Sequence, residues 1–180
     1  MIDGMYYEKI FILFISFMLV ACIPKKSQLP IKSVKIEKTP ILKSIKESLI
    51  ENCQIDTNNS ILLELNESVL KIDLGYKDDF QSGSQLLVQT AKNRLLCIAP
   101  ILIKQNTLTI QITGHANENN DTIKDQHLSD NRAITVAEEL FNLGVRDEIF
   151  AKGCGGEKLK NSKVEIFIYE DKSKLKDQCK

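Results

Sequence analysis

The sequence predicts a small α/β fold, a two-layer sandwich in which helices cover one face of a mixed sheet. Short apolar runs of strand length alternate along the chain with longer segments whose apolar residues recur at helical spacing. Strands that alternate with helices favour this layered architecture. A chain of 180 residues has a usual length for one domain. We place that domain at residues 55–170 and a charged tail at residues 171–180.

The first part of the domain predicts a hairpin followed by a helix. Residues 61–65 and 69–74 are apolar-rich runs separated by three polar residues, which favours two paired strands. Ser84 is a candidate N-cap of the following helix, because its hydroxyl can accept an orphan backbone N–H. Pro100 removes a backbone hydrogen bond and is expected to kink or end that helix near Ala99. The apolar residues at helical spacing are Leu86, Leu87, Ala91, Leu95, Ile98, Ala99 and Leu102.

The next elements are a strand and a second helix. Apolar and polar residues alternate between residues 108 and 113, which suits a strand with one buried face. Ser129 is a candidate N-cap of the second helix, and Gly144 is expected to end it. The apolar stripe of this helix consists of Ala133, Val136, Ala137, Leu140 and Phe141.

Residues 1–21 have the organisation of a lipoprotein signal peptide. Residues 10–20 are an apolar run interrupted only by Ser16, and the run is shorter than the roughly 20 residues that span a bilayer. The run ends in Leu-Val-Ala-Cys, which resembles a bacterial lipobox and implies cleavage before Cys22 and lipidation of that cysteine. The alternative is an uncleaved anchor helix, and both interpretations place the rest of the chain outside the cytoplasm. Ile23 follows the cysteine where an inner-membrane retention signal would have Asp, which favours the outer membrane.

Residues 22–54 predict a basic tether between the lipid and the domain. Seven lysines and two glutamates between residues 23 and 50 give it a net charge of +5, and three prolines interrupt regular structure. Ile41, Ile45 and Leu49 are spaced to form one face of a short helix. Two interpretations stay open: a solvated linker, and a segment that becomes ordered on a partner or on anionic headgroups.

Residues 114–133 carry the most informative pattern, a Gly-His-Ala-Asn start followed by a polar loop and Leu-Ser-x-x-Arg-Ala. This pattern resembles the peptidoglycan-binding loop and helix of the OmpA C-terminal-like domain, in the branch of the peptidoglycan-associated lipoproteins. Residues 80–84 resemble the family's Phe-x-Ser-Gly-Ser element, and residues 149–153 and 161–166 resemble its later strands. The resemblance covers about residues 60–169. The positions in register are Gly114, His115, Leu128, Ser129, Arg132 and Ala133.

The resemblance implies non-covalent binding of peptidoglycan through the diaminopimelate of its stem peptide. The free end of that group carries one ammonium and one carboxylate, so its receptor needs an anion and a cation held close together. Arg132 is expected to hold the carboxylate, because its planar fork can donate two parallel hydrogen bonds. Ser129, at the expected helix N-terminus, favours the same anion. His115 belongs to the same motif and completes the site that the resemblance implies.

Position 117 departs from the family pattern, because the ligand-binding Asp of the family is Asn117 here. A charge-assisted hydrogen bond contributes ~1.5–3 kcal/mol and a neutral one ~0.5–1.5 kcal/mol. The loss of charge would therefore weaken binding roughly tenfold. Glu118 is adjacent and could supply the charge. Asp125 stands where the family has an Asn that organises the loop, and it could also restore the missing anion.

The composition argues against nucleic acid as a partner, since 24 Lys and Arg residues balance 24 Asp and Glu residues. No Ser-His-Asp or Cys-His arrangement emerges, so we expect a binding protein that is not an enzyme and uses no cofactor. His115, His127 and Cys154 match no zinc-ligand spacing, so no metal is expected. Four cysteines remain besides Cys22. Cys97 is expected to be a buried thiol in an apolar helix, which leaves at most one disulfide.

These features predict an outer-membrane lipoprotein whose periplasmic domain anchors the envelope, or an envelope complex, to peptidoglycan. Its partners are then the stem peptide, the membrane that holds the lipid, and envelope proteins. The alternative is a structural subunit of an envelope-spanning type IVB secretion machine, in which wall binding is weak or lost. The missing Asp and the basic tether suit that alternative, and the chain also resembles the OmpA-like lipoprotein of the Dot/Icm systems. A hydrolase is the third class, and the sequence shows no catalytic set for it.

Overall fold

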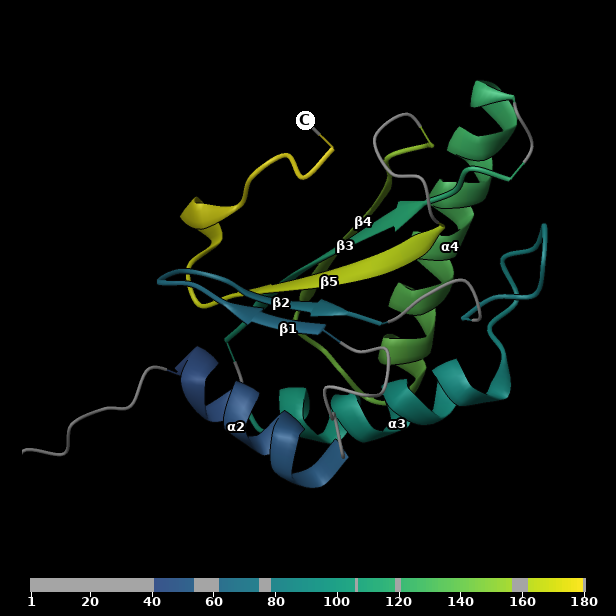
Figure 1. The fold of residues 1–180 in the computed structure, drawn as a ribbon. Helices are drawn as coiled ribbons and strands as arrows, with labels where there is room; N and C mark the ends of the chain where they lie inside the picture. The colour runs from purple at the N-terminus through teal and green to yellow at the C-terminus, as the bar shows by residue number, and fades with distance from the viewer. Residues whose placement is uncertain are drawn as a thin grey trace, which may run out of the picture. The chain divides into compact units, whose positions relative to one another are not determined.

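The structure, a computed structural model, describes residues 41–53, 62–74, 79–105, 107–118, 121–156 and 162–179. These residues form two layers, a five-stranded mixed sheet and three α-helices on one of its faces (Figure 1). The expected fold class is therefore confirmed. The signal peptide, the lipobox and the tether up to residue 40 lie outside the described residues. Among the helices that are described, none has the length and apolar character needed to cross a membrane.

The sheet consists of β1 (Leu62–Leu65), β2 (Leu70–Asp73), β3 (Thr109–His115), β4 (Glu148–Gly153) and β5 (Lys163–Tyr169). Its strand order is β1-β2-β5-β3-β4, in which β3 and β4 run parallel and the other neighbours antiparallel. The expected hairpin is confirmed, since β1 pairs with β2 and the Asn66 side chain accepts the N–H groups of Ser68 and Val69 in the turn. Strand β3, which lies between β5 and β4, is buried along its whole length, whereas alternation alone predicts one buried face.

The helices are α2 (Ile41–Cys53), α3 (Gln89–Ile103) and α4 (Thr122–Asn142), and the hydrophobic core lies between them and the sheet. Successive side chains of a strand point to opposite faces of the sheet, so the apolar residues at every second position point toward this core. The buried strand residues of the core are Leu70, Ile72, Ile110, Ile112, Val164, Ile166 and Ile168.

Helix α2 belongs to the folded domain. The helical spacing in the tether predicts this helix correctly, but its apolar face is packed in the core and Cys53 is bonded to Cys97 of α3. The domain therefore starts upstream of residue 55, and the solvated-linker interpretation does not hold for this part of residues 22–54. The buried residues of α2 are Leu42, Ile45 and Leu49.

Helix α3 begins and ends later than expected. Ser84 is not its N-cap, because the Ser84 hydroxyl accepts the N–H of Leu86 in a local turn and the helix starts only at Gln89. Pro100 lies inside the helix, which continues to Ile103. The proline ring is exposed, so its main cost is one missing backbone donor. Six buried residues of α3 hold the helix against the core and override that cost.

Helix α4 begins earlier than expected. Its N-cap is Asp121, whose side chain accepts two N–H groups of the first turn at 3.0 and 3.2 Å. Ser129 lies buried inside the helix, so its predicted capping role is wrong. Gly144 is confirmed at the other end, where its φ of +102° suits glycine. Phe141, expected in the apolar stripe, is exposed instead.

The cysteines of the described residues form two disulfides, where at most one is expected from the sequence. Cys53–Cys97 joins α2 to α3, and Cys154–Cys179 joins the residue after β4 to the C-terminal segment. Cys97 is half-buried at the edge of the apolar face of α3, so the prediction of a buried thiol is wrong. Residues 171–179 of the expected charged tail are also folded, since they contain the short 3-10 helix η1 (Lys172–Lys174).

If α2 is part of the cooperative fold, truncation of its buried face must destabilise the whole domain. Ile45 is fully buried, whereas Ile50 is 48% exposed on the same helix. Ile45→Ala is expected to lower the free energy of unfolding by about 2–5 kcal/mol, and Ile50→Ala by less than about 0.5 kcal/mol. Urea titrations followed by circular dichroism measure both values. Equal losses in the two variants would contradict the packing of α2 described here.

Candidate ligand-binding site

Arg132, the arginine of the sequence motif, is buried. Its side chain is 2% exposed on α4. Its Nε donates to the carbonyl oxygen of Ser84 at 2.9 Å, and its Nη1 lies 2.6 Å from Oε1 of Glu118. The guanidinium also lies over the ring of Phe80, 4.9 Å from the ring centre. A buried charge without such partners is strongly destabilising, so these contacts fix the arginine in one place.

Glu118 is held on both of its carboxylate oxygens. Oε2 accepts the N–H of Gly83 at 2.7 Å, while Oε1 faces Arg132. Burial raises the pKa of the Glu118 carboxyl, but hydrogen bonds from Arg132, Ser162 and Gly83 outweigh this and hold the pKa below its usual range. The side chain of Glu118 is therefore an anion at neutral pH, and 25% of its surface is exposed.

Asp125 contacts the loop that carries Glu118. Its side chain is buried in the first turn of α4, and its Oδ1 accepts the N–H of Glu118 at 3.2 Å. Asn117 is exposed, and its N–H donates to the Ser162 hydroxyl at 3.3 Å. The structure thus places Glu118 against Arg132, with Asp125 bonded to the N–H of Glu118 and Asn117 preceding it in the chain. The charge that position 117 lacks is present one residue later.

Ser129 faces the β4 side of the site and does not lie at a helix N-terminus. Its hydroxyl donates to the carbonyl oxygen of Gln126 at 2.8 Å and accepts the N–H of Gly155 at 2.9 Å. The anion-binding role expected for Ser129 required free N–H groups of a first turn, and those belong to residues near Asp121. Ser129 therefore holds the loop after β4 against α4.

Two glycines allow the close approach of α4 to the strands, and a third allows the loop after β4 to contact the loop after β3. A Cβ at Gly114 would lie 2.1 Å from the carbonyl oxygen of Ser129, and one at Gly153 would lie 2.3 Å from the N atom of Asp130. A Cβ at Gly156 would lie 2.4 Å from the carbonyl oxygen of Ala116. No side chain fits these spaces, so glycine is required by the backbone contact itself.

His115 is not brought to Arg132. Gly114 faces α4, so the next residue faces the opposite side of the sheet, and His115 Nε2 lies 3.2 Å from Glu165 Oε2. Burial raises the pKa of Glu165, but hydrogen bonds from His115, Lys163 and Lys71 lower it to about 2. His115 belongs to this charged network across the sheet.

Phe80, Gly83 and Ser84 complete the site although residue patterns gave them no ligand role. They precede Arg132 by about 50 positions; the Arg132–Ser84 hydrogen bond joins residues 48 apart. The sequence signal for these residues is the Phe-x-Ser-Gly-Ser element at residues 80–84, which by itself predicts a helix start and no ligand contact. The described residues contain no group of three His, Cys, Asp or Glu side chains that could hold a metal ion.

Comparisons with known proteins identify relatives of this fold. A model of the OmpA family matches residues 79–166. The structure of an outer membrane protein from Borrelia burgdorferi is 30% identical to this chain with a TM-score of 0.52, and the match covers 61% of this chain and 97% of that one. A search of curated protein sequences gives no match.

Two further solved structures share the fold at lower identity. The cell wall anchor of the T6SS from Pseudomonas aeruginosa is 21% identical with a TM-score of 0.55, and the match covers 72% of this chain and 97% of that one. The periplasmic domain of MotB from Helicobacter pylori is 20% identical with a TM-score of 0.54, and the match covers 66% of this chain and 85% of that one. At this identity the two similarities support the fold alone.

Proposed function

The chain belongs to the OmpA family, and from this premise we propose that its domain binds peptidoglycan non-covalently and anchors an envelope structure to it. The proposed ligand is the zwitterionic end of the diaminopimelate stem peptide. The observation that carries this proposal is the Glu118–Arg132 ion pair. It places an anion beside the arginine of the motif although position 117 is uncharged. The role is binding, and no catalytic step is proposed.

The two charges are held in place before a ligand arrives. Arg132 is fixed by the Ser84 carbonyl and the Phe80 ring, and Glu118 by the N–H of Gly83. The Glu118 backbone is fixed in turn by Asp125. Groups that are already ordered lose little conformational entropy on binding, so a small zwitterion can be held by few contacts.

Glu118 is the charged group of the pair that solvent reaches, since Arg132 is almost completely covered. We therefore assign the ammonium of the ligand to Glu118, in the role that the family gives to the residue at position 117. The carboxylate of the ligand is assigned to the guanidinium of Arg132, which it reaches when Oε1 of Glu118 turns toward the ammonium. A planar guanidinium suits a carboxylate in this position.

Substitutions at Glu118 and at Asn117 distinguish which of the two residues binds the ligand ammonium. Glu118→Gln removes the proposed anion and is expected to weaken binding of a diaminopimelate-containing muropeptide about tenfold. Asn117→Asp is expected to change the affinity by less than about twofold, because Glu118 already supplies the charge. Calorimetric titration of the protein measures both. Glu138→Gln, at an exposed position of α4, is the matched control and should bind as the unaltered protein does.

The reverse pattern would contradict the assignment of Glu118. If Asn117→Asp tightens binding tenfold and Glu118→Gln has no effect, the site lacks an anion and Glu118 is only a structural partner of Arg132. If Glu118→Gln tightens binding, the carboxylate of Glu118 blocks the arginine.

The second candidate function is the structural subunit of an envelope-spanning secretion machine. The observation that favours it is the internal pairing of Arg132, whose charge is satisfied within the chain. Sedimentation of the purified protein with isolated sacculi separates the two functions. Retention on the sacculi supports wall anchoring. Absence of retention, together with co-purification in a large envelope complex, supports the secretion machine.

We also propose that lipid on Cys22 holds the chain in the outer membrane with its domain in the periplasm. The support is the Leu-Val-Ala-Cys pattern after a short apolar run. Cys22→Ala is expected to leave an uncleaved precursor and to abolish labelling by a radioactive fatty acid. Ser27→Ala, just beyond the cleavage site, is the control and should be processed and labelled normally. Undiminished labelling of the Cys22 variant would refute the anchor.

A further inference from the structure

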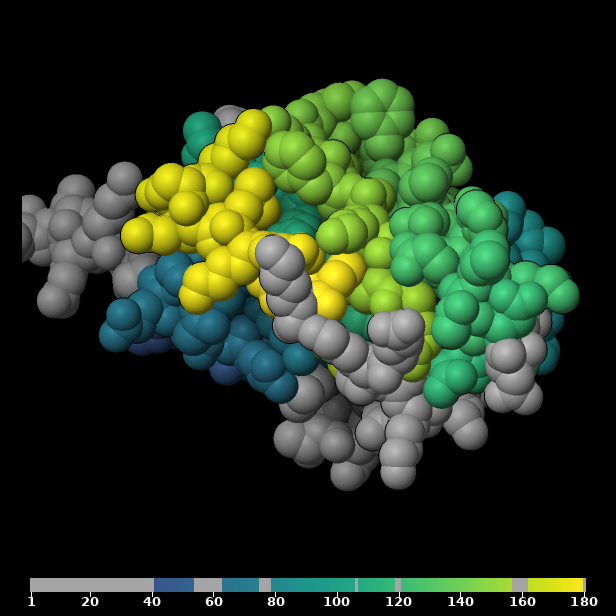
Figure 2. All heavy atoms as spheres, turned by 90° about the horizontal axis from the view of Figure 1, so that it is seen from above, coloured from purple at the N-terminus to yellow at the C-terminus, as the bar shows by residue number. Residues whose placement is uncertain are grey.

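Residues 171–179 form a C-terminal strap that lies on the sheet face opposite the described helices. Gln178 Nε2 donates to the hydroxyl of Tyr169 at 2.9 Å, on the face of β5 that points away from the core. The strap also reaches β4, where Lys152 lies 3.2 Å from Asp177. Figure 2 shows the C-terminal residues in yellow at the surface, beside the blue residues of the β1–β2 hairpin.

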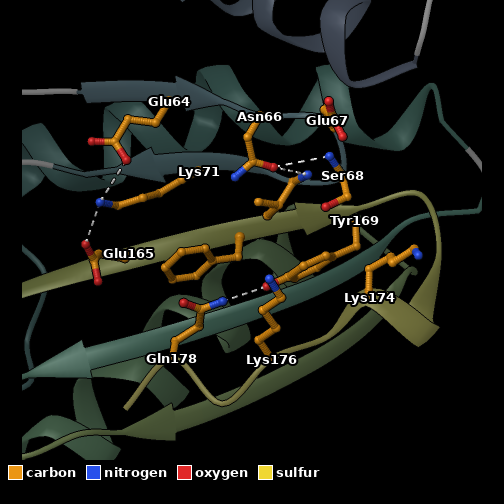
Figure 3. Close-up of a pocket in the computed structure, with 12 residues that line it drawn as sticks. Glu64, Asn66, Glu67, Ser68, Lys71, Glu165, Tyr169, Lys174, Lys176 and Gln178 are labelled. Carbon is orange, nitrogen blue, oxygen red and sulfur yellow. Dashed lines mark hydrogen bonds and ion pairs between the residues drawn. The ribbon is translucent and has the colours of Figure 1, made fainter. Parts of the chain in front are cut away.

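The strap is only partly packed on the sheet. A hollow of about 620 Å³ lies between it and the hairpin (Figure 3). Lys174 and Lys176 line the strap side of this hollow, and Asn66 and Glu67 line the hairpin side. The ion pairs that tie the strap to β4 are exposed to solvent, and such pairs contribute little. Among the described residues, the Cys154–Cys179 disulfide is therefore the strongest tie of the strap.

This disulfide ends in the glycine turn, which we define as residues 153–156. The turn follows β4 directly, and the N–H of Cys154 donates to the carbonyl oxygen of Gly114 at 2.8 Å. On the α4 side, the N–H of Gly153 donates to Asp130 Oδ1 at 2.7 Å, and the Ser129 hydroxyl accepts the N–H of Gly155. The turn thus fills the space between β3 and α4.

The glycine turn also contacts the loop that carries the proposed anion. The N–H of Ala116 donates to the carbonyl oxygen of Gly155 at 3.2 Å. A Cβ added to Gly156 would lie 3.1 Å from Cα of Asn117, so the two backbones are in direct contact. Glu118 is the next residue along the chain. A displacement of the turn would therefore be transmitted to Glu118 over a distance of one or two residues.

We propose that the strap and its disulfide position the glycine turn, and through it the Asn117–Glu118 loop, for ligand binding. Cys154 and Cys179 are positioning residues in this assignment, because neither contacts the ion pair that holds the ligand. The effect on affinity rests on the proposed function, whereas the effect on the loop is independent of it. The Cys53–Cys97 disulfide provides an internal control, since it joins α2 to α3 and has no part in the turn.

The test compares two double variants of the full chain, Cys154→Ser with Cys179→Ser and Cys53→Ser with Cys97→Ser. Amide hydrogen exchange is followed by mass spectrometry in peptides that cover residues 114–118 and 153–156. The first double variant is expected to speed exchange in both segments by about tenfold and to weaken muropeptide binding about fivefold. The second is expected to leave exchange in these segments and the affinity unchanged.

Unchanged exchange in residues 114–118 and 153–156 of the first variant would overturn the proposal, even if the strap itself exchanges faster. Equal effects of both double variants would also overturn it, because they would report general destabilisation. Cys179→Ser alone, which leaves the sequence of the glycine turn intact, gives the same test if the double variant does not fold. If the unaltered protein binds no muropeptide, the proposed function fails while the exchange result still decides the positioning role.

Discussion

The burial of one guanidinium, that of Arg132, organises the surroundings of the proposed ligand site. A charge removed from water requires partners, and Arg132 recruits them from segments that are far apart in the chain. The Ser84 carbonyl comes from the turn before α3, the Phe80 ring from the same turn, and the Glu118 carboxylate from the loop after β3. Arg132 therefore fixes the position of the turn before α3 relative to the loop after β3. The conformation of the second loop in turn fixes the Glu118 carboxylate.

Backbone packing supplies the rigidity that the ion pair needs. Gly114 and Gly153 let α4 approach β3 and β4 to a distance at which no Cβ fits, so the helix that carries Arg132 has one position on the sheet. Ser129 and Asp130 then accept N–H groups of the glycine turn from the same helix. The motif residues thus divide into two roles. Arg132 carries the charge, whereas Gly114 and Ser129 set the distance between helix and sheet.

The fold class, the hairpin and the strand that precedes the motif could be predicted from the sequence, because alternating and helical periodicities record which side chains face the core. The failures have physical causes. Ser84 and Ser129 are good capping residues, but the Ser84 hydroxyl is used in a local turn and the Ser129 hydroxyl in a contact with the glycine turn. Neither use leaves a local sequence signal. Pro100 stays within α3 because tertiary packing outweighs one lost hydrogen bond. The disulfide of Cys97 was not predicted because its partner, Cys53 of α2, lies 44 residues away in the sequence. The expectation that Arg132 belongs to the site came from the family resemblance. The pairing of Glu118 with Arg132 did not, because it depends on the loop conformation.

The central claim is that Glu118 is an ionised receptor group, held beside Arg132 and available to the ammonium of a wall peptide. The most direct test is the pKa of the Glu118 carboxyl, measured by nuclear magnetic resonance of its carboxyl carbon with and without a diaminopimelate-containing muropeptide. Hydrogen bonds from Arg132 and Gly83 predict a pKa below the usual value for glutamate in the free protein. In the complex the ligand ammonium replaces Arg132 as the partner of the carboxylate, so the pKa is predicted to stay below the usual value. A pKa at the usual value that does not move when the muropeptide is added would contradict the account.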